Sequence, residues 1–239
     1  MLKRSIAVAA LVLGFNLVTA VPATAHHERC HQVLPTISGT SGDDVIVGTP
    51  GPDVIVASSG NDRIDGLGGG DTICGEDGND RIHGGDGNDY ANGGNGDDVV
   101  FGDAGNDAVL IGEAGNDVIY GGDGNDVMQG LGGKDVEYGG AGDDFMIGAF
   151  DNDTLFGQEG NDTLTGGPCA FQRPCIAGED ADVLHGGPGD DGLNGSEGDD
   201  VLFGDAGEDS LEGGLGRDDC IGGEGTDTAT TCERIALVP

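Results

Sequence analysis

Aspartate recurs every nine residues along most of this 239-residue chain, and this regular supply of carboxylates is its clearest chemical feature. Carboxylate and backbone carbonyl oxygens are the ligands that calcium, a hard cation, prefers. Twenty residues share the position, and Asp44, Asp53 and Asp227 are the outermost. We expect the other seventeen to be metal ligands: Asp62, Asp71, Asp80, Asp89, Asp98, Asp107, Asp117, Asp126, Asp135, Asp144, Asp153, Asp162, Asp182, Asp191, Asp200, Asp209 and Asp218.

Glycine and one apolar residue keep step with this aspartate. If the aspartate is numbered six, position one is glycine in eighteen units and Ala57 or Ala177 in the others. Position four is glycine in eighteen units and Asp151 or Asp180 in the others. Position eight is apolar in every unit except one, where it is Glu137. A disordered acidic linker does not keep such a pattern through twenty cycles.

Each unit is interpreted as six residues of turn followed by three residues of strand. Such a strand buries its single apolar side chain only if neighbouring units stack on it. Two units form one coil, so unit n pairs with unit n+2 in a parallel sheet, and the position-eight residues, Val109 among them, face each other inside. We therefore predict an all-β fold, a right-handed parallel β-roll (a β-solenoid) of about twenty nonapeptide repeats.

The narrow core predicts that the fold depends on bound ions. Burial of one aliphatic side chain contributes about 1.5–3 kcal/mol, whereas ordering nine residues costs about 1–2 kcal/mol each. Calcium held between the turns of units n and n+2 can supply the difference, because glycine lets a tight turn direct its carbonyls inward. Without calcium the aspartates repel one another. We expect folding and the binding of multiple calcium ions to be one event.

Several units, among them "GGDGNDYAN", "GGNGDDVVF" and "GGDGNDVMQ", carry a family resemblance. They resemble the glycine-rich nonapeptide of RTX, or haemolysin-type calcium-binding, repeat proteins. The resemblance implies a β-roll with calcium between consecutive turns and the position-six aspartate as main side-chain ligand. Two departures matter: the chain has a general secretory signal and little outside the repeat, and its first two units lack the second glycine, with Pro50 and Pro52 in one turn. Toxin or enzyme activity is therefore not carried over, and the early ion sites are not expected.

The chain divides into five segments. Residues 1–25 have a basic start, an apolar run and an Ala-Thr-Ala ending, which is typical of a cleaved secretory signal peptide. Residues 26–38 are expected to form an N-terminal cap segment, 39–230 the calcium-binding roll and 231–239 a C-terminal cap. A loop at 168–179 interrupts one unit. We therefore expect a secreted, extracellular protein.

The charge balance limits the partners. Beyond residue 25 lie all 45 acidic residues and 7 of the 9 basic ones, a formal net charge of 7 − 45 = −38. This charge argues against nucleic acid and anionic membrane surfaces, and no later stretch is apolar enough for membrane insertion. One ion for each stacked pair of turns would make 20 − 2 = 18 ions, whose 36 positive charges nearly match.

The six cysteines all lie beyond the signal segment and predict three disulfides. Local pairing would join Cys169 to Cys175, Cys220 to Cys232 and Cys30 to Cys74. A thiolate metal site is the alternative, although calcium prefers oxygen and the spacing matches no zinc module. The sequence "HHERCH" at 26–31 also has two interpretations, a copper or zinc site and a solvated terminus.

Position nine points outward, and its aromatic residues fall on one sheet if the 168–179 loop lies within one unit: His83, Phe101, Tyr120, Tyr138, Phe156, His185 and Phe203. The other sheet presents Asn92, Leu110, Gln129, Ile147, Thr165 and Asn194. The aromatic column has two interpretations. It is a ladder of stacked rings, or it is a partner face, built on Phe101, Tyr120, Tyr138, Phe156 and Phe203, for a polysaccharide, a cell surface or a second copy.

Sequence motifs of catalysis are missing: there is no H-E-x-x-H, G-x-S-x-G or P-loop pattern. We expect no enzyme. The leading hypothesis is a secreted calcium-binding repeat protein with an extracellular structural or interaction role, and an adhesin module using the aromatic column is the alternative. A toxin or enzyme fragment is less favoured. Glu137 either marks a register change or contacts water.

Overall fold

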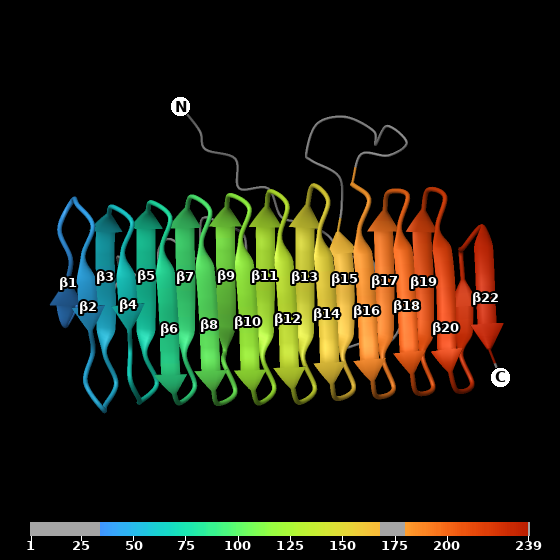
Figure 1. Cartoon of the computed structure of the whole chain (residues 1–239), viewed down its shortest axis with the longest axis horizontal. Helices are drawn as coiled ribbons and strands as arrows, with labels where there is room; N and C mark the ends of the chain where they lie inside the picture. The colour runs from blue at the N-terminus through green and yellow to red at the C-terminus, as the bar shows by residue number, and fades with distance from the viewer. Residues whose placement is uncertain (1–33, 168–179, 239) are drawn as a thin grey trace, which may run out of the picture.

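The computed structural model describes residues 34–167 and 180–238, and this part of the chain is built from β-strands without any helix (Figure 1). No helix that could span a membrane therefore occurs among the described residues. The strands are β1 (Ile37–Ser38), β2 (Val45–Val47), β3 (Val54–Ser59), β4 (Arg63–Asp65), β5 (Thr72–Asp77), β6 (Arg81–Asp86), β7 (Tyr90–Asn95), β8 (Val99–Ala104), β9 (Val109–Ala114), β10 (Val118–Asp123), β11 (Val127–Gly132), β12 (Val136–Ala141), β13 (Phe145–Phe150), β14 (Thr154–Glu159), β15 (Thr163–Gly167), β16 (Val183–Pro188), β17 (Gly192–Glu197), β18 (Val201–Ala206), β19 (Ser210–Leu215), β20 (Asp219–Glu224), β21 (Thr228–Thr230) and β22 (Arg234–Val238).

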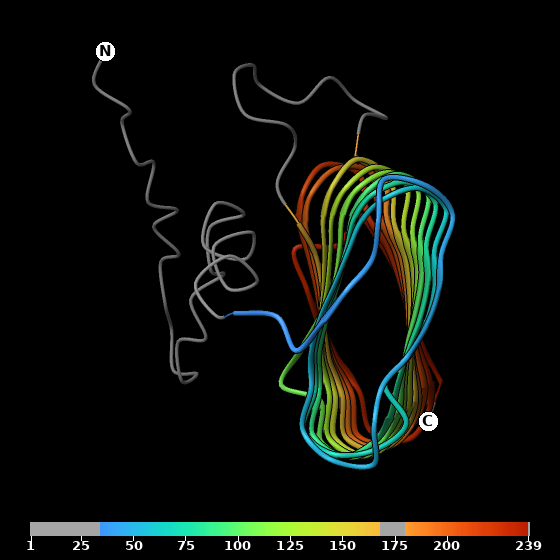
Figure 2. The ribbon, with the colours of Figure 1, turned by 90° about the vertical axis from the view of Figure 1, so that its left-hand side faces the viewer.

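The strands form two parallel sheets of eleven strands each. Odd-numbered strands β1 to β21 make one sheet, here called the odd sheet, and even-numbered strands β2 to β22 make the other, the even sheet. Viewed along the axis, successive coils superimpose into a flattened tube with a row of turns at each edge (Figure 2). The predicted parallel β-solenoid is confirmed. Strands β2 to β21 correspond to the twenty units, and β1 and β22 extend the two ends.

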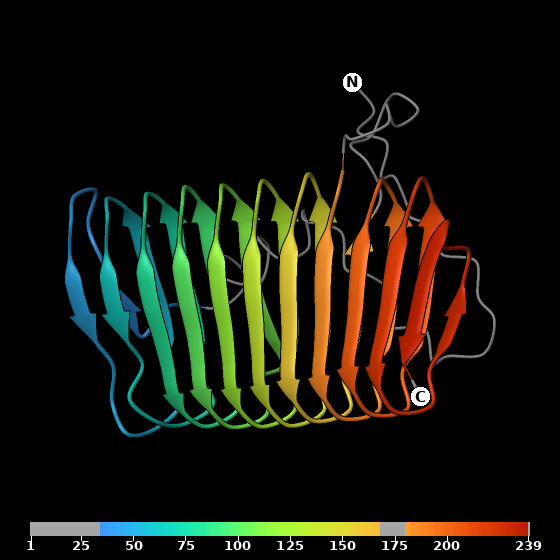
Figure 3. The ribbon, with the colours of Figure 1, turned by 45° about the vertical axis from the view of Figure 1, so that its right-hand side comes forward.

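The strands are longer than the three residues that the sequence predicted. Most span six residues, because the parallel pairing continues from position seven of one unit through position three of the next. Only the last part of each presumed turn is tightly bent, and neighbouring coils lie in close register over their whole length (Figure 3). The short strands β2, β4 and β21 occur near the ends of the rod.

The core is a double column of position-eight side chains between the sheets. Its members include Ile55, Ile64, Ile73, Ile82, Ile119, Met128, Leu155 and Leu202, all without solvent exposure. Register within each sheet is regular, and Met128, for example, pairs with Met146. Each residue of the column therefore packs on the position-eight residue two units away.

One inward assignment was wrong. Leu110, rather than Val109, lies in the core, and Ile111, rather than Leu110, is the outward residue that pairs with Asn92. The extra residue of this unit lies before the strand, at Ala108, which shifts the following three positions by one. The nine-residue count alone placed it after the strand. Ile111 packs with Cys74 and Tyr90 in a small second cluster on the outer face of the odd sheet.

Candidate metal centre

The turns have an alternating backbone conformation that sets the direction of their polar groups. Positions two and four both have positive φ, as at Gly122 (+117°) and Gly124 (+132°). Position two accepts side chains at lower positive φ, such as Glu113 at 78°. Position four is more restricted: a Cβ added to Gly105 would meet the carbonyl oxygen of Gly87 in the adjacent turn. Glycine therefore predominates at position four, and the two exceptions, Asp151 and Asp180, have the lower φ of 73° and 62°.

The position-six aspartates are linked to one another along both rows of turns. The backbone N–H of each donates to Oδ1 of the aspartate two units later, as from Asp107 to Asp126 at 2.8 Å. Eighteen such bonds, of 2.7 to 3.2 Å, run from Asp44 and Asp53 to Asp218 and Asp227. One oxygen of every later carboxylate is thus committed to the neighbouring turn.

The second carboxylate oxygen, Oδ2, is buried and has no hydrogen-bond partner in any of the seventeen aspartates predicted as ligands. In most turns it points toward the position-one glycine, and a Cβ on Gly121 would meet Oδ2 of Asp126; Gly166 lies at the corresponding place for Asp182. Buried polar atoms are nearly always paired, so a regular series of unpaired ones indicates a missing ligand. The sequence missed one member of the series, Asp227, whose Oδ2 is also unpaired and which continues the same nine-residue period.

Burial raises the pKa of most of these carboxyl groups. Desolvation raises the pKa of Asp98 to about 8 and that of Asp107 to about 7, against the hydrogen bonds that favour their charged forms. Repulsion by aspartates of neighbouring turns adds to the effect, as Asp117 and Asp80 do on Asp98. The largest value, about 10, belongs to Asp153. A cation beside each Oδ2 would stabilise the charged carboxylate and so oppose these shifts.

The first two units differ. Oδ2 of Asp44 accepts bonds from the N–H (2.6 Å) and hydroxyl (2.9 Å) of Thr40, and Oδ2 of Asp53 accepts the N–H of Thr49 at 2.6 Å. The backbone bond from Thr49 holds the pKa of Asp53 below its usual value. These carboxylates are satisfied by their own turns. The units that the sequence set apart by their missing second glycine therefore have threonine at that place.

The donor set fits calcium. Each turn offers one unpaired carboxylate oxygen, and φ > 0 at two positions lets backbone carbonyls share the inner side of the turn. Within the described residues, no three His, Cys, Asp or Glu side chains converge as a metal-binding group. An ion between two turns would therefore depend on backbone carbonyls beside its aspartates, and hard oxygen-ligand cations suit such a shell.

The family model described as the RTX calcium-binding nonapeptide repeat (4 copies) matches this chain at residues 38–73, 75–109, 107–137, 138–168, 176–202 and 194–229. These matches cover well over half of the sequence. The chain belongs to the RTX calcium-binding repeat family. No curated protein matches it in a search of such sequences. RTX repeats bind calcium, and this property agrees with the donor set described above.

A second ladder in the RTX turns was missed from the sequence. Position five is often asparagine or aspartate, and its side-chain oxygen accepts the N–H of position five two units later, as Asn61 does from Asn79 at 2.9 Å. These bonds run opposite to those of position six. The recurring "GND" and "GDD" triplets could have revealed it. Position five thus links exposed turn backbones and leaves position six for the ion.

Glu137 does not mark a register change. It pairs in sequence register with Ile119 and Leu155 in the even sheet and has no solvent exposure, so it does not contact bulk water. Neither carboxylate oxygen has a hydrogen-bond partner. Desolvation, with the nearby charge of Asp135, raises the pKa of Glu137 well above its usual value.

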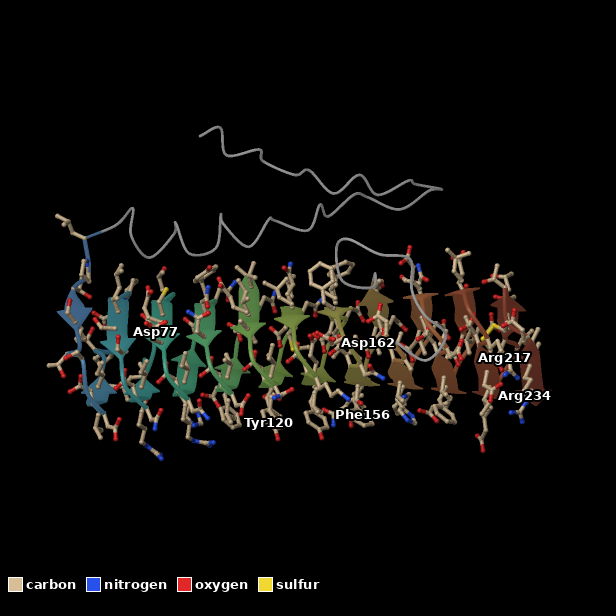
Figure 4. The ribbon with its side chains drawn as sticks, turned by 90° about the horizontal axis from the view of Figure 1, so that it is seen from above. Asp77, Tyr120, Phe156, Asp162, Arg217 and Arg234 are labelled. Carbon is tan, nitrogen blue, oxygen red and sulfur yellow. A yellow bond between two sulfur atoms is a disulfide. The ribbon has the colours of Figure 1, made fainter. Side chains whose placement is uncertain are left out.

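The outward aromatic residues form one continuous stack on the even sheet. Rings from His83, Phe101, Tyr120, Tyr138, Phe156, His185 and Phe203 follow one another with centroids 4.3 to 5.1 Å apart and nearly parallel planes. Figure 4 shows Tyr120 and Phe156 projecting from the same side of the rod, whereas Asp162 lies inside its outline. Because ring faces contact one another along the stack, the five inner rings present only their edges to a partner. This geometry favours the ladder interpretation.

Of the predicted disulfides, the Cys220–Cys232 bond is confirmed. Cys74 is also disulfide-bonded, and its expected partner Cys30 lies outside the described residues. The expected pair Cys169 and Cys175 lies outside them as well, as do the signal peptide and the "HHERCH" segment. No described cysteine is free for a thiolate metal site.

Proposed function

We propose that this chain is a secreted calcium-binding rod that folds when calcium fills the spaces between its stacked turns. The observation that carries the proposal is the set of eighteen position-six aspartates, Asp62 to Asp227, whose buried Oδ2 atoms lack partners. Unpaired buried carboxylates are among the most unfavourable groups in a folded protein. Their repetition in every complete turn is explained if each accepts a cation.

The coupling to folding follows from electrostatics. In each row, carboxylates of consecutive turns stack directly on one another, and Asp98 repels both Asp80 and Asp117. Folding without ions would bring these like charges together in a poorly hydrated space. Divalent ions placed between them convert repulsion into attraction. The core of one aliphatic residue per unit is too small to offset that repulsion alone.

The location that best suits such a switch is outside the cell. The secretory-type pattern of residues 1–25 supports export, and extracellular calcium-binding modules work at about 0.1–1 mM. The chain would remain expanded at low intracellular calcium and become a rod after export. We assign it a structural or interaction role and no catalytic one. A carbohydrate-binding role for the aromatic column has less support, because carbohydrate stacking requires free ring faces.

The test is far-UV circular dichroism of the chain from residue 26, titrated with calcium from a chelated start and with magnesium in parallel. We expect a cooperative coil-to-β transition with calcium and little change with magnesium, which demands a smaller and more regular shell. A rod already formed in chelator, or an equal response to both ions, would refute the proposal. Equilibrium dialysis would count the bound ions against the eighteen available Oδ2 atoms.

A further inference from the structure

Three departures from the repeat lie far apart in sequence and come together in space. Glu137 replaces the apolar residue of position eight, and Asp151 and Asp180 replace the glycine of position four. Their units lead into β12, β14 and β16, which are consecutive in the even sheet. All three departures therefore belong to adjacent turns of one row. Each of them adds a carboxylate.

Glu137 brings a carboxylate to this row from the core. Its side chain is completely buried, and both of its oxygens lack partners. The charge of Asp135, in the same turn, raises the pKa of Glu137, and the charge of Glu137 raises the pKa of Asp153 in the next turn. Its carboxylate thus lies beside the space between these two turns. An uncharged aliphatic side chain occupies the corresponding place in the neighbouring units, at Ile119 and Leu155.

Asp180 brings a second additional carboxylate to this row of turns. It is 3% exposed, and neither carboxylate oxygen has a partner. Beyond burial, the pKa of Asp180 is raised by the charges of Asp200 and Glu197 in the following turn and of Asp151 in the preceding one. Its carboxylate therefore lies between stacked turns, where glycine leaves only backbone. Asp151 is exposed and adds a further charge from the outer side.

We propose that the turns ending at Asp135, Asp153 and Asp182 form the tightest cation centre of the rod, which fills before the plain turns because Glu137, Asp151 and Asp180 surround its ions with additional carboxylates. This inference rests on the proposed binding of calcium between turns. Ions there keep the position-six aspartates of the other sites as ligands. They gain the attraction of the buried, unpartnered carboxylates of Glu137 and Asp180, whereas the additional carboxylates near plain turns, such as Asp103 beside Asp107, are exposed. The first coils to fold would be these central ones.

The test is a calcium titration of the mature chain in competition with a chromophoric chelator, which resolves the tightest step. The variant E137Q/D151N/D180N removes three charges and keeps the side-chain shapes, and asparagine tolerates the positive φ of Asp151 and Asp180 (73° and 62°). The matched control D86N/E159Q/E208Q removes three charges from exposed sites in the other row of turns.

We expect the calcium affinity of the tightest step to fall at least tenfold in the first variant. A tenfold change corresponds to the attraction between one unit charge and a divalent ion ~6 Å apart in water. The control should change by less than about threefold. Equal shifts in both variants, or tighter binding by the first, would overturn the inference while leaving calcium binding intact. Absence of calcium binding by the unsubstituted chain would overturn the proposed function as well.

A second variant guards against misfolding. E137L/D151G/D180G restores the residues that the repeat has elsewhere, so it should form the rod in excess calcium, as circular dichroism would show. We expect the same loss of the tightest step. If this repeat-like variant keeps that step unchanged, the additional carboxylates have no part in cation binding.

Discussion

Replacement of Asp144 by asparagine should have opposite effects with and without calcium. Asp144 is buried in a plain turn, its Oδ1 accepts the Asp126 N–H at 2.8 Å, and its Oδ2 is unpaired. Asparagine keeps the acceptor and removes the charge. Any purely structural role for the side chain would therefore be preserved, and the difference between the two conditions isolates the ion.

The magnitudes follow from the structure. Burial raises the pKa of Asp144 from 3.8 to about 7, which corresponds to about 4 kcal/mol of destabilisation near neutral pH. Solvent screening reduces this by roughly half, so D144N should stabilise the calcium-free rod by about 2 kcal/mol. In calcium the variant loses a charged ligand. If the ion binds 10- to 100-fold more weakly, the folded rod loses about 1.4–2.7 kcal/mol of binding free energy.

The assay is circular dichroism under two conditions. In chelator, a stabilising osmolyte should fold D144N at a lower concentration than the unsubstituted chain; without osmolyte, the calcium midpoint of D144N should be higher. The control is D143N, the same change at the exposed neighbouring residue, whose Oδ1 accepts the Asn161 N–H. Equal calcium midpoints for D144N and D143N, or a loss of stability by D144N in both media, would refute the reasoning.

Three further predictions concern the turns, the ladder and pH. G105A should destabilise the rod by about 2 kcal/mol or more in thermal unfolding, because a Cβ at φ +145° meets the Gly87 carbonyl, whereas Q158A, at an exposed position with φ 76°, should change it by less than about 0.5 kcal/mol. Y138S should retain calcium-induced folding but lower the unfolding free energy in saturating calcium by about 1–3 kcal/mol, since it breaks two ring contacts, and an unchanged value would mean that the ladder is inert. The calcium-free chain should gain β-structure on acidification. Raised pKa values, about 6 for Asp80 and about 8 for Asp98, mean that the fold is most stable below about pH 4 and loses this stability as pH rises through 6 to 8, and a circular-dichroism signal that does not vary with pH would contradict it.

The architecture could be predicted from the sequence because each of twenty units has the same short strand with one apolar side chain, which only stacking can bury. Period, strand pairing, inward residues and the aromatic column all follow from counting, and the count was wrong at Leu110, where one extra residue has two possible places. Counting also places the units of Glu137, Asp151 and Asp180 in one row, because unit n lies beside unit n+2. The burial of Glu137 and Asp180 without partners, and the different partners of Oδ1 and Oδ2, appear only in three dimensions.

The linked aspartates give the rod a chemical direction. Along each row, the position-six N–H donates to a carboxylate of the coil that follows it, and at the C-terminal end of one row Glu233 takes this place, accepting the Asp218 N–H at 2.7 Å. A rod shortened from its C-terminus would end in unsatisfied donors, whereas one shortened from its N-terminus would end in spare acceptors, which water or an ion can satisfy. The two ends are thus unequal as starting points for growth. When the chain becomes available for folding from its N-terminus, each coil lacks carboxylate partners for its N–H groups until the following coil can also fold.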